Sequence, residues 1–319
     1  MGDAARLSVV VPFRNVERYF QACLDSLFAQ TRPVDELILV DDRSTDDTAA
    51  IAERAARARP NVKIIRGPGR GAAAARNLGL QHATGDYLAF ADADDVLEPD
   101  MYERMVRLLE SENLDMALCN ARYHFEGREA DKPVFAHAAL AGPVSGSEWL
   151  AHKLESREFL HAVWMHLYRR AFLEDNRLRF TEGLMHEDVT WTTKALMLAK
   201  RVAYVDAPLY AYRRQPREFT RQALDERLCR VIETAMIDAR MLEDMAKQAD
   251  ARLARAIRWQ LVDGGLSVFH KIRQLSSPSL RRQETAKVRK AKYFGLLWRN
   301  ADARQRRKLA SRYVKALFA

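Results

Sequence analysis

The sequence has few of the features that anchor a protein in a membrane or brace it with covalent bridges. Only three cysteines occur among its 319 residues, far apart and with no CxxC pair: Cys23, Cys119 and Cys229. Such usage is typical of a reducing cytosol and argues against a disulfide or zinc framework. The longest apolar runs, at 7–13 and 37–40, are far shorter than the roughly 20 residues that cross a bilayer. The N-terminus also lacks a cationic segment followed by an apolar core, so we expect a cytoplasmic protein.

Positive charge is abundant but unevenly distributed. The net charge is +9, yet residues 251–319 hold 18 Lys and Arg against 3 Asp and Glu, and residues 1–250 hold 34 against 40. The C-terminal part is therefore strongly basic, with interleaved aromatic residues. Two interpretations are open: a helical bundle whose arginines are solvated, or a surface that binds anionic lipid headgroups. No nucleic-acid recognition motif accompanies the charge, so we expect no nucleic acid partner.

Strand-like and helix-like patterns alternate along the first 120 residues. Apolar stretches at 7–11, 36–40, 62–66 and 87–91 predict buried strands, and the segments 16–30, 48–59 and 72–82 predict helices between them. Such a series forms a mainly parallel sheet with helices on both faces. Ligands bind these sheets beyond the carboxyl ends of the strands. Three of those ends carry polar clusters that we expect to converge, at 12–15, 41–42 and 92–95.

Three carboxylates follow the strand 87–91 within four residues, at Asp92, Asp94 and Asp95. Crowded carboxylates raise each other's pKa unless a positive charge neutralises them, and clustered oxygen ligands suit Mg²⁺ or Mn²⁺. This DxD pattern therefore predicts a cation. The alternative is that Asp94 or Asp95 caps the helix predicted at 100–110 or turns the chain with Pro99.

A second acidic pair, Glu187 and Asp188, precedes a helix predicted at 189–200. Taken alone, the pair is also what a helix start favours, because carboxylates interact well with the positive end of the helix macrodipole. After residue 219 the pattern becomes helical, with apolar residues at helical intervals along 224–248.

Six sequence blocks occur in order at 8–15, 39–46, 71–79, 85–95, 185–189 and 208–214. In order and spacing they resemble family 2 glycosyltransferases of the GT-A fold, over roughly residues 6–220. The resemblance implies an α/β catalytic domain at 1–220, with a nucleotide-sugar half about 1–120 and an acceptor half about 121–220. A basic helical region follows at 221–319. It also implies inverting transfer from a UDP-sugar to a hydroxyl of a glycan or lipid-linked glycan in capsule, lipopolysaccharide or exopolysaccharide synthesis.

The resemblance also assigns roles on the donor side. Asp94 is the first choice as ligand of Mn²⁺ or Mg²⁺, Asp92 reaches the ribose or a metal-bound water, and Asp95 can share either role. The remaining donor-site residues contact the nucleotide. In this assignment Pro12, Phe13 and Asn15 line the uracil pocket, Asp42 accepts a hydrogen bond from the ring, Arg76 faces the pyrimidine and phosphates, and Arg213 and Arg214 close over the diphosphate. The alternatives are a turn and helix cap for Asp41 and Asp42, and a solvated helical arginine for Arg76.

On the acceptor side, the resemblance makes Asp188 the general base and Glu187 the residue that orients the acceptor. A base opposite the leaving UDP predicts a β-linked product from an α-linked donor. At residues 215–219 the chain departs from the family, which commonly has a pair of small residues after this strand. Two roles are open for His166, which either contacts the acceptor or packs in the core. Trp164 and Trp191 either stack on a sugar face or belong to the core.

Two other functions are consistent with such a chain. A sugar nucleotidyltransferase would need a glycine-rich signature and a phosphate-holding lysine near the first strand, where this sequence has residues 12–15 instead. A non-catalytic binding module for glycans or membrane surfaces is the second, because a fold alone does not establish function.

Overall fold

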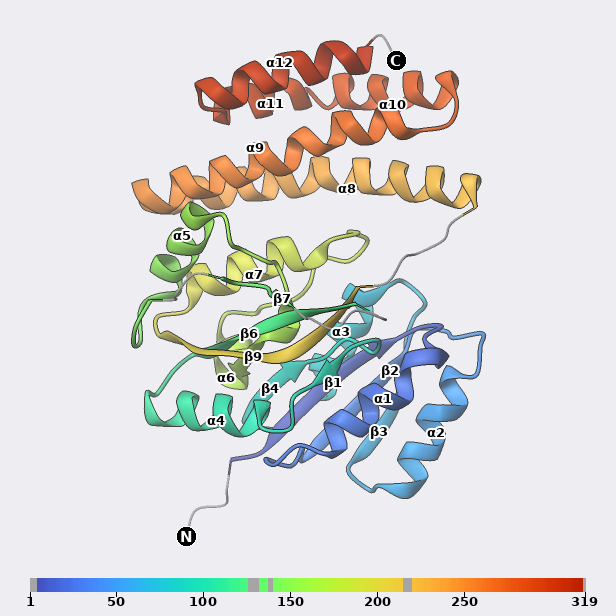
Figure 1. Ribbon diagram of the computed structural model, residues 1–319, viewed down its shortest axis with the longest axis vertical. Coiled ribbons are helices and arrows are strands. Elements are labelled where there is room, and N and C mark those ends of the chain that lie inside the picture. The colour runs from blue at the N-terminus through green and yellow to red at the C-terminus, as the bar shows by residue number, and fades with distance from the viewer. Residues whose placement is uncertain (1–4, 126–131, 137–139, 215–219, 318–319) are drawn as a thin grey trace. The chain divides into compact units, whose positions relative to one another are not determined.

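The computed structural model describes residues 5–125, 132–136, 140–214 and 220–317 (Figure 1). Within these ranges the contacts divide the chain into two compact units. The first comprises Met1–Trp149, Glu158–Gly183 and Trp191–Gln215, and the second Leu150–Arg157, Leu184–Thr190 and Pro216–Ala319. The segments 150–157 and 184–190 therefore pack with the C-terminal helices, although the sequence places them within the expected catalytic range.

The first half of the sheet follows the predicted alternation. Strands β1 (Leu7–Phe13), β2 (Glu36–Asp41), β3 (Val62–Arg66) and β4 (Tyr87–Phe90) pair in parallel in the order β3-β2-β1-β4. Helices α1 (Glu17–Phe28), α2 (Thr48–Ala58) and α3 (Ala72–His82) connect them. These elements confirm the predicted βαβ series to within two residues at each end.

Beyond β4 the sheet is mixed. Its further strands are β5 (Val96–Leu97), β6 (Met116–Phe125), β7 (Lys132–Pro133), β8 (His166–Arg169) and β9 (Val202–Arg214). Strand β8 runs antiparallel to both β4 and β6, β6 and β9 are parallel, and β5 and β7 add antiparallel pairs. The sheet of nine strands runs β3-β2-β1-β4-β8-β6-β9-β5, with β7 on β6. The other elements of this part are α4 (Met101–Ser111), α5 (Gly146–Ser156), the 3₁₀ turn at Val163–Met165, α6 (Arg170–Asp175) and α7 (Glu187–Leu198).

Strand β1 is covered on both faces, which is why its sequence reads as continuous apolar residues. Leu7, Val9 and Val11 belong to the large core cluster that also contains buried residues of α1 and α4. Val10 points to the opposite face, against α3. A Cβ on Gly79 would lie 2.2 Å from Val10 Cγ1, so only glycine permits the close approach of this helix.

The second unit contains the C-terminal helices (Figure 1), which confirm the predicted helical extension. They are α8 (Arg221–Gln248), α9 (Ala251–Gln274), α10 (Pro278–Lys290), α11 (Tyr293–Asn300) and α12 (Ala303–Leu317). Thr220, Asp250 and Ser277 cap three of them by accepting backbone N–H bonds. In the part of the chain that the structure describes, no helix is both long and apolar enough to cross a membrane.

Candidate active site

The polar clusters that follow β2 and β4 are brought to the end of β1 by backbone hydrogen bonds. The Asp42 N–H donates to the Phe13 carbonyl at 2.9 Å, and the Ala91 N–H donates to the Val10 carbonyl at 3.1 Å. Parallel neighbours share one edge of a sheet, so the three predicted strand ends do converge. Phe13 is buried, while Asn15 is exposed and lies in the left-handed region with φ 51°.

Asp42 holds the glycine-rich loop before α3. Its Oδ1 accepts the Gly69 N–H and its Oδ2 accepts the Gly71 N–H, both at 2.7 Å, and the residue is only 3% exposed. Asp41 Oδ1 accepts the Ser44 N–H at 2.8 Å, which confirms the turn interpretation for this residue. The uracil contact assigned to Asp42 stays a prediction, and it would have to use the remaining lone pairs of the same carboxylate.

Arg76 is not a solvated arginine, and that alternative is wrong. Its Nη2 donates to Asp92 Oδ1 at 2.7 Å, with side chains 7% and 28% exposed, and its guanidinium lies 5.6 Å from the centre of the Phe180 ring. The Asp92 N–H donates to the Tyr210 hydroxyl at 3.1 Å. Asp92 therefore has a positive partner within the chain and is fixed by β9.

Asp95 is the most deeply buried carboxylate of the acidic loop 92–95, at 1% exposure. Its Oδ1 accepts the Arg213 N–H at 2.7 Å, whereas its buried Oδ2 has no hydrogen-bond partner among the described residues. Burial raises the pKa of Asp95 well above its usual range, and the charges of Asp94 and Asp92 raise it further. The Arg213 Nε also donates to the Asp94 carbonyl at 2.9 Å, so β9 clamps the loop at two points.

The alternative that the loop caps a helix is wrong, because α4 begins at Met101 after its N-cap residue Asp100. The buried thiol of Cys23 lies in the same surroundings. Burial raises its pKa, and the charges of Asp95, Asp94 and Asp92 raise it further.

The loop fits a cation that is held in part by a substrate. No group of three His, Cys, Asp or Glu residues in the described ranges is arranged to hold a metal by itself. Asp94 is half-buried, and the next residue, Asp95, has one oxygen without a hydrogen-bond partner among the described residues. Mg²⁺ and Mn²⁺ take oxygen ligands, and Mg²⁺ often takes one or two carboxylates and completes its shell with water and substrate phosphates. These carboxylate oxygens are compatible with a cation that also binds water and substrate phosphates. Among the described residues they do not form a closed site of protein ligands alone.

Helix α7 begins at Glu187, two residues before the predicted start, so Glu187 and Asp188 lie in its first turn. Both residues belong to the second unit. Glu187 is 9% exposed and Asp188 is half-buried. Another buried carboxylate of this unit, Asp238 of α8, is 8% exposed, and its Oδ1 has no hydrogen-bond partner among the described residues. Burial and then the charge of Glu187 raise the pKa of Asp238 to about 7.

Asp238 was not predicted from the sequence, because the segment 224–248 was interpreted only from the spacing of its apolar residues, the methionines among them. Met236, Met241 and Met245 are only half-buried, whereas the buried stripe of α8 continues through 238, 239, 242 and 246. A charged residue at a position of the buried stripe is the signal that could have revealed it.

The questioned aromatic residues are core. Trp164 stacks on Tyr210 with ring centres 4.1 Å apart, and Trp191 stacks on Phe180 at 3.9 Å; both tryptophans are nearly inaccessible. His166 is also a packing residue, since it is 4% exposed and burial lowers its pKa to about 3. Arg214 is exposed at the end of β9, and residues 215–219 lie outside the described residues.

The architecture is similar to that of solved glycosyltransferases with the GT-A fold. The chain is similar to Staphylococcus aureus TarS 1–349 in complex with UDP-GlcNAc, with a TM-score of 0.59 and 20% identity over 98% of this chain and 90% of that one. It is also similar to the mannosyltransferase PcManGT from Pyrobaculum calidifontis in complex with GDP-Man and Mn²⁺, with a TM-score of 0.54 and 20% identity over 99% and 88%. At such identities the likeness establishes the fold alone.

The family is established by sequence. The model of glycosyl transferase family 2 matches residues 8–176, and the chain belongs to this family. It is 37% identical over 214 residues to the uncharacterized glycosyltransferase YibD of Escherichia coli strain K12, which covers 66% of this chain and 62% of that protein. It is 34% identical over 229 residues to the uncharacterized glycosyltransferase EpsJ of Bacillus subtilis strain 168, covering 70% and 66%. The chain thus aligns with about three fifths to two thirds of these relatives' length.

We predict that Asp95→Asn stabilises the metal-free protein at neutral pH. A carboxyl with a raised pKa contributes stability below its unfolded pKa, and this contribution is lost as the pH rises through the folded pKa. Wild type should therefore lose stability relative to Asp95→Asn as the pH rises above the usual pKa of an aspartate. Urea unfolding in EDTA over a series of pH values measures the difference, and a pH-independent difference would contradict the buried, unneutralised Asp95.

Proposed function

We propose that this chain transfers a sugar, with inversion, from a UDP-sugar to a hydroxyl of a glycan in the synthesis of a bacterial surface polysaccharide, and that it requires Mn²⁺ or Mg²⁺. The observation that carries the proposal is the buried, incompletely neutralised acidic loop 92–95 at the carboxyl end of β4. TarS supports the choice of donor, because its structure was solved with UDP-GlcNAc. TarS is named a poly(ribitol-phosphate) β-N-acetylglucosaminyltransferase, and it is 30% identical to this chain over 216 residues, covering 65% of this chain and 35% of TarS.

On the donor side, Asp94 would hold the cation, with Asp95 within the same loop. When bound, such an ion neutralises charge on the departing diphosphate. Asp92 is oriented by Arg76 and would accept from the ribose or a metal-bound water, while Arg76 itself would face the pyrimidine and phosphates. Pro12, Phe13, Asn15 and Asp42 would surround the uracil, and Arg213 and Arg214 would contact the diphosphate.

On the acceptor side, Asp188 would take the proton from the attacking hydroxyl, and Glu187 would orient the acceptor. A general base has to be within hydrogen-bond reach of that hydroxyl and ionised at the working pH. Because its pKa is raised to about 7, the Asp238 carboxyl is partly protonated near neutral pH. Partial protonation limits its repulsion of the Glu187 carboxylate. The fold and the family membership are both consistent with this assignment of roles.

We expect UDP-sugars to stabilise the protein only when a divalent cation is present. A ligand at 100 times its Kd adds about 2.7 kcal/mol to the free energy of unfolding. Thermal unfolding with UDP-GlcNAc, UDP-glucose, UDP-galactose and UDP-glucuronate, each with Mn²⁺ or with EDTA, would identify the donor. Asp94→Asn should abolish the Mn²⁺-dependent part of the shift. Equal shifts in EDTA would refute the proposed cation.

We predict that Asp188→Asn lowers kcat about 10²- to 10⁴-fold, the usual contribution of a general base. The UDP shift with Mn²⁺ should be unchanged, because the donor site does not include this residue. The matched control is Asp206→Asn, an exposed carboxylate on β9. Near-normal transfer by Asp188→Asn would disprove its role. UDP-sugar binding by wild type without transfer or hydrolysis would favour the non-catalytic module.

We further propose that the protein works at the cytoplasmic face of an anionic membrane, through helices α11 and α12. Trp298 is 40% exposed and Val314 50%, although both are large apolar residues. The Arg306 guanidinium lies 5.6 Å from the centre of the Trp298 ring, and the neighbouring Lys308 is exposed. Exposed aromatics with basic neighbours suit the interface of an anionic bilayer.

We expect the protein to sediment with phosphatidylglycerol vesicles at low salt and to be released at high salt, because each basic residue near the surface contributes about 1 kcal/mol. The double variant Trp298→Ala with Lys308→Ala should bind at least fivefold less. The matched control is Leu198→Ala with Lys194→Ala, an exposed pair on α7. Equal binding by all three proteins would exclude this surface.

A further inference from the structure

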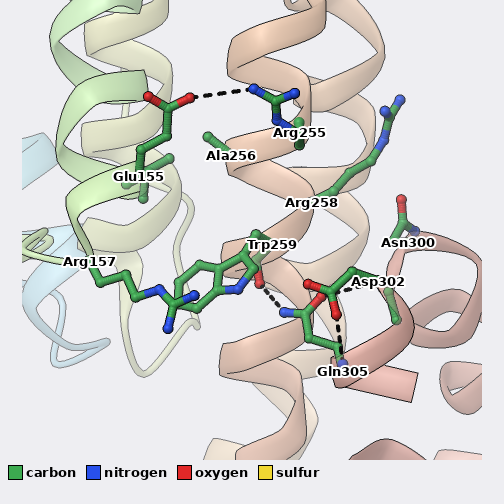
Figure 2. Close-up of a pocket in the computed structure, with 11 residues that line it drawn as sticks. Glu155, Arg157, Arg255, Ala256, Arg258, Trp259, Asn300, Asp302 and Gln305 are labelled. Carbon is green, nitrogen blue, oxygen red and sulfur yellow. Dashed lines mark hydrogen bonds and ion pairs between the residues drawn. The ribbon is translucent and has the colours of Figure 1, made fainter. Parts of the chain in front are cut away.

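A pocket of about 540 Å³ lies wholly within the second unit, between the end of α5, helix α9 and the junction of α11 with α12 (Figure 2). Pockets of about 300 to 1,000 Å³ are the size that holds small ligands. Its lining includes three arginines and an aromatic ring: Arg157, Arg255, Arg258 and Trp259. None of these residues belongs to the donor or acceptor roles assigned above.

The carboxylates that line this pocket already have partners. Glu155 accepts from Arg252 at 2.8 Å and lies 3.8 Å from Arg255, and a hydrogen bond from Arg252 is the main reason that its pKa is lowered. Asp302 Oδ1 accepts the Gln305 N–H at 2.7 Å at the start of α12. Gln305 in turn donates to the Trp259 carbonyl at 3.0 Å, which Figure 2 shows as a link between α12 and α9. Glu155 therefore links α5 to α9, and Asp302 is occupied by the start of α12.

Two of the arginines have no acidic partner. Neither Arg157 nor Arg258 forms an ion pair with any Asp or Glu that the structure describes, and both are exposed. The Arg157 guanidinium lies over the Trp259 ring, 4.7 Å from its centre, as Figure 2 shows. Stacking on a ring fixes the plane of a guanidinium and leaves its N–H edges available to an oxyanion.

The end of α5 positions Arg157. This residue follows the last residue of α5 in the left-handed region, with φ 61°. Helices often end in this conformation, and Arg177 and Lys292 of this chain adopt it too. Glycine adopts it without strain, so glycine can replace Arg157 without harm to the backbone.

We propose that this pocket binds a phosphate ester, with Arg157 and Arg258 holding the phosphate oxygens and Trp259 forming the adjacent wall. Guanidinium groups match phosphate oxygens in bidentate geometry and remain charged at any physiological pH. Apolar side chains of Leu154 and Ala256 complete the lining and suit the carbon skeleton of a sugar or polyol that carries the phosphate. The phosphate can come from a soluble sugar phosphate or from a phospholipid headgroup.

The test is a titration of the full chain with glucose 1-phosphate, in saturating UDP and the diamagnetic Mg²⁺ to block the donor site, followed by the indole N–H signals in NMR. The Trp259 signal, assigned with Trp259→Phe, should shift with saturation, and glucose should leave it unchanged. Arg258→Ala should weaken binding at least tenfold. The exposed Arg304→Ala of α12 is the matched control for loss of one positive charge and should bind like wild type. Equal weakening by both variants would contradict binding in this pocket and would indicate nonspecific attraction to positive charge.

Arg157→Gly separates binding from folding. Glycine relieves the left-handed backbone, so its Tm should equal or exceed that of wild type while affinity for glucose 1-phosphate falls at least tenfold. A variant that binds normally would disprove the role of this residue. Parallel titrations with vesicles of phosphatidylglycerol or phosphatidylcholine distinguish the sources. A Trp259 shift with phosphatidylglycerol alone assigns the site to a lipid headgroup, and the absence of a shift with every phosphate probe refutes the proposal.

Discussion

The first unit depends on how negative charge is accommodated where a buried strand ends. Strand β4 leads directly into three aspartates, one of which is almost inaccessible to solvent. Within the described residues, Arg76 pairs with Asp92, and Arg213 contributes its backbone N–H to Asp95 and its Nε to the Asp94 carbonyl. The buried Asp95 Oδ2 has no hydrogen-bond partner among those residues, and the proposed cation depends on this feature.

The same loop is held in place by distant parts of the chain. Strand β9 reaches it through Tyr210 and Arg213, more than a hundred residues later, and Trp164 stacks on Tyr210 behind it. The acidic loop is thus supported by the buried stack of Trp164 on Tyr210. On the other side of the strand ends, Asp42 organises the glycine-rich loop that begins α3. The first unit thus uses carboxylates in two ways, as loop fasteners and as potential ligands.

The second unit uses its charge differently. Much of the basicity of residues 251–319 is exposed, but it is not uniform: Arg299 pairs with Glu243, while Arg258 forms no ion pair with a described Asp or Glu. Arg157, which packs in the same unit, also lacks an acidic partner among the described residues, and its guanidinium lies over the Trp259 ring. Net charge alone could not separate these cases.

The sequence by itself determined the βαβ alternation, the acidic loop and the helical C-terminal part, because periodicity and turn residues are local signals that β1 to β4 follow without conflict. It also carried the family blocks, since these depend on order and spacing. Only the tertiary structure decided that β8 enters antiparallel between β4 and β6, that Arg76 is buried against Asp92, and that Asp238 lies in the field of Glu187. These depend on contacts between residues far apart in the chain, and burial and pKa are set by those contacts and not by local sequence.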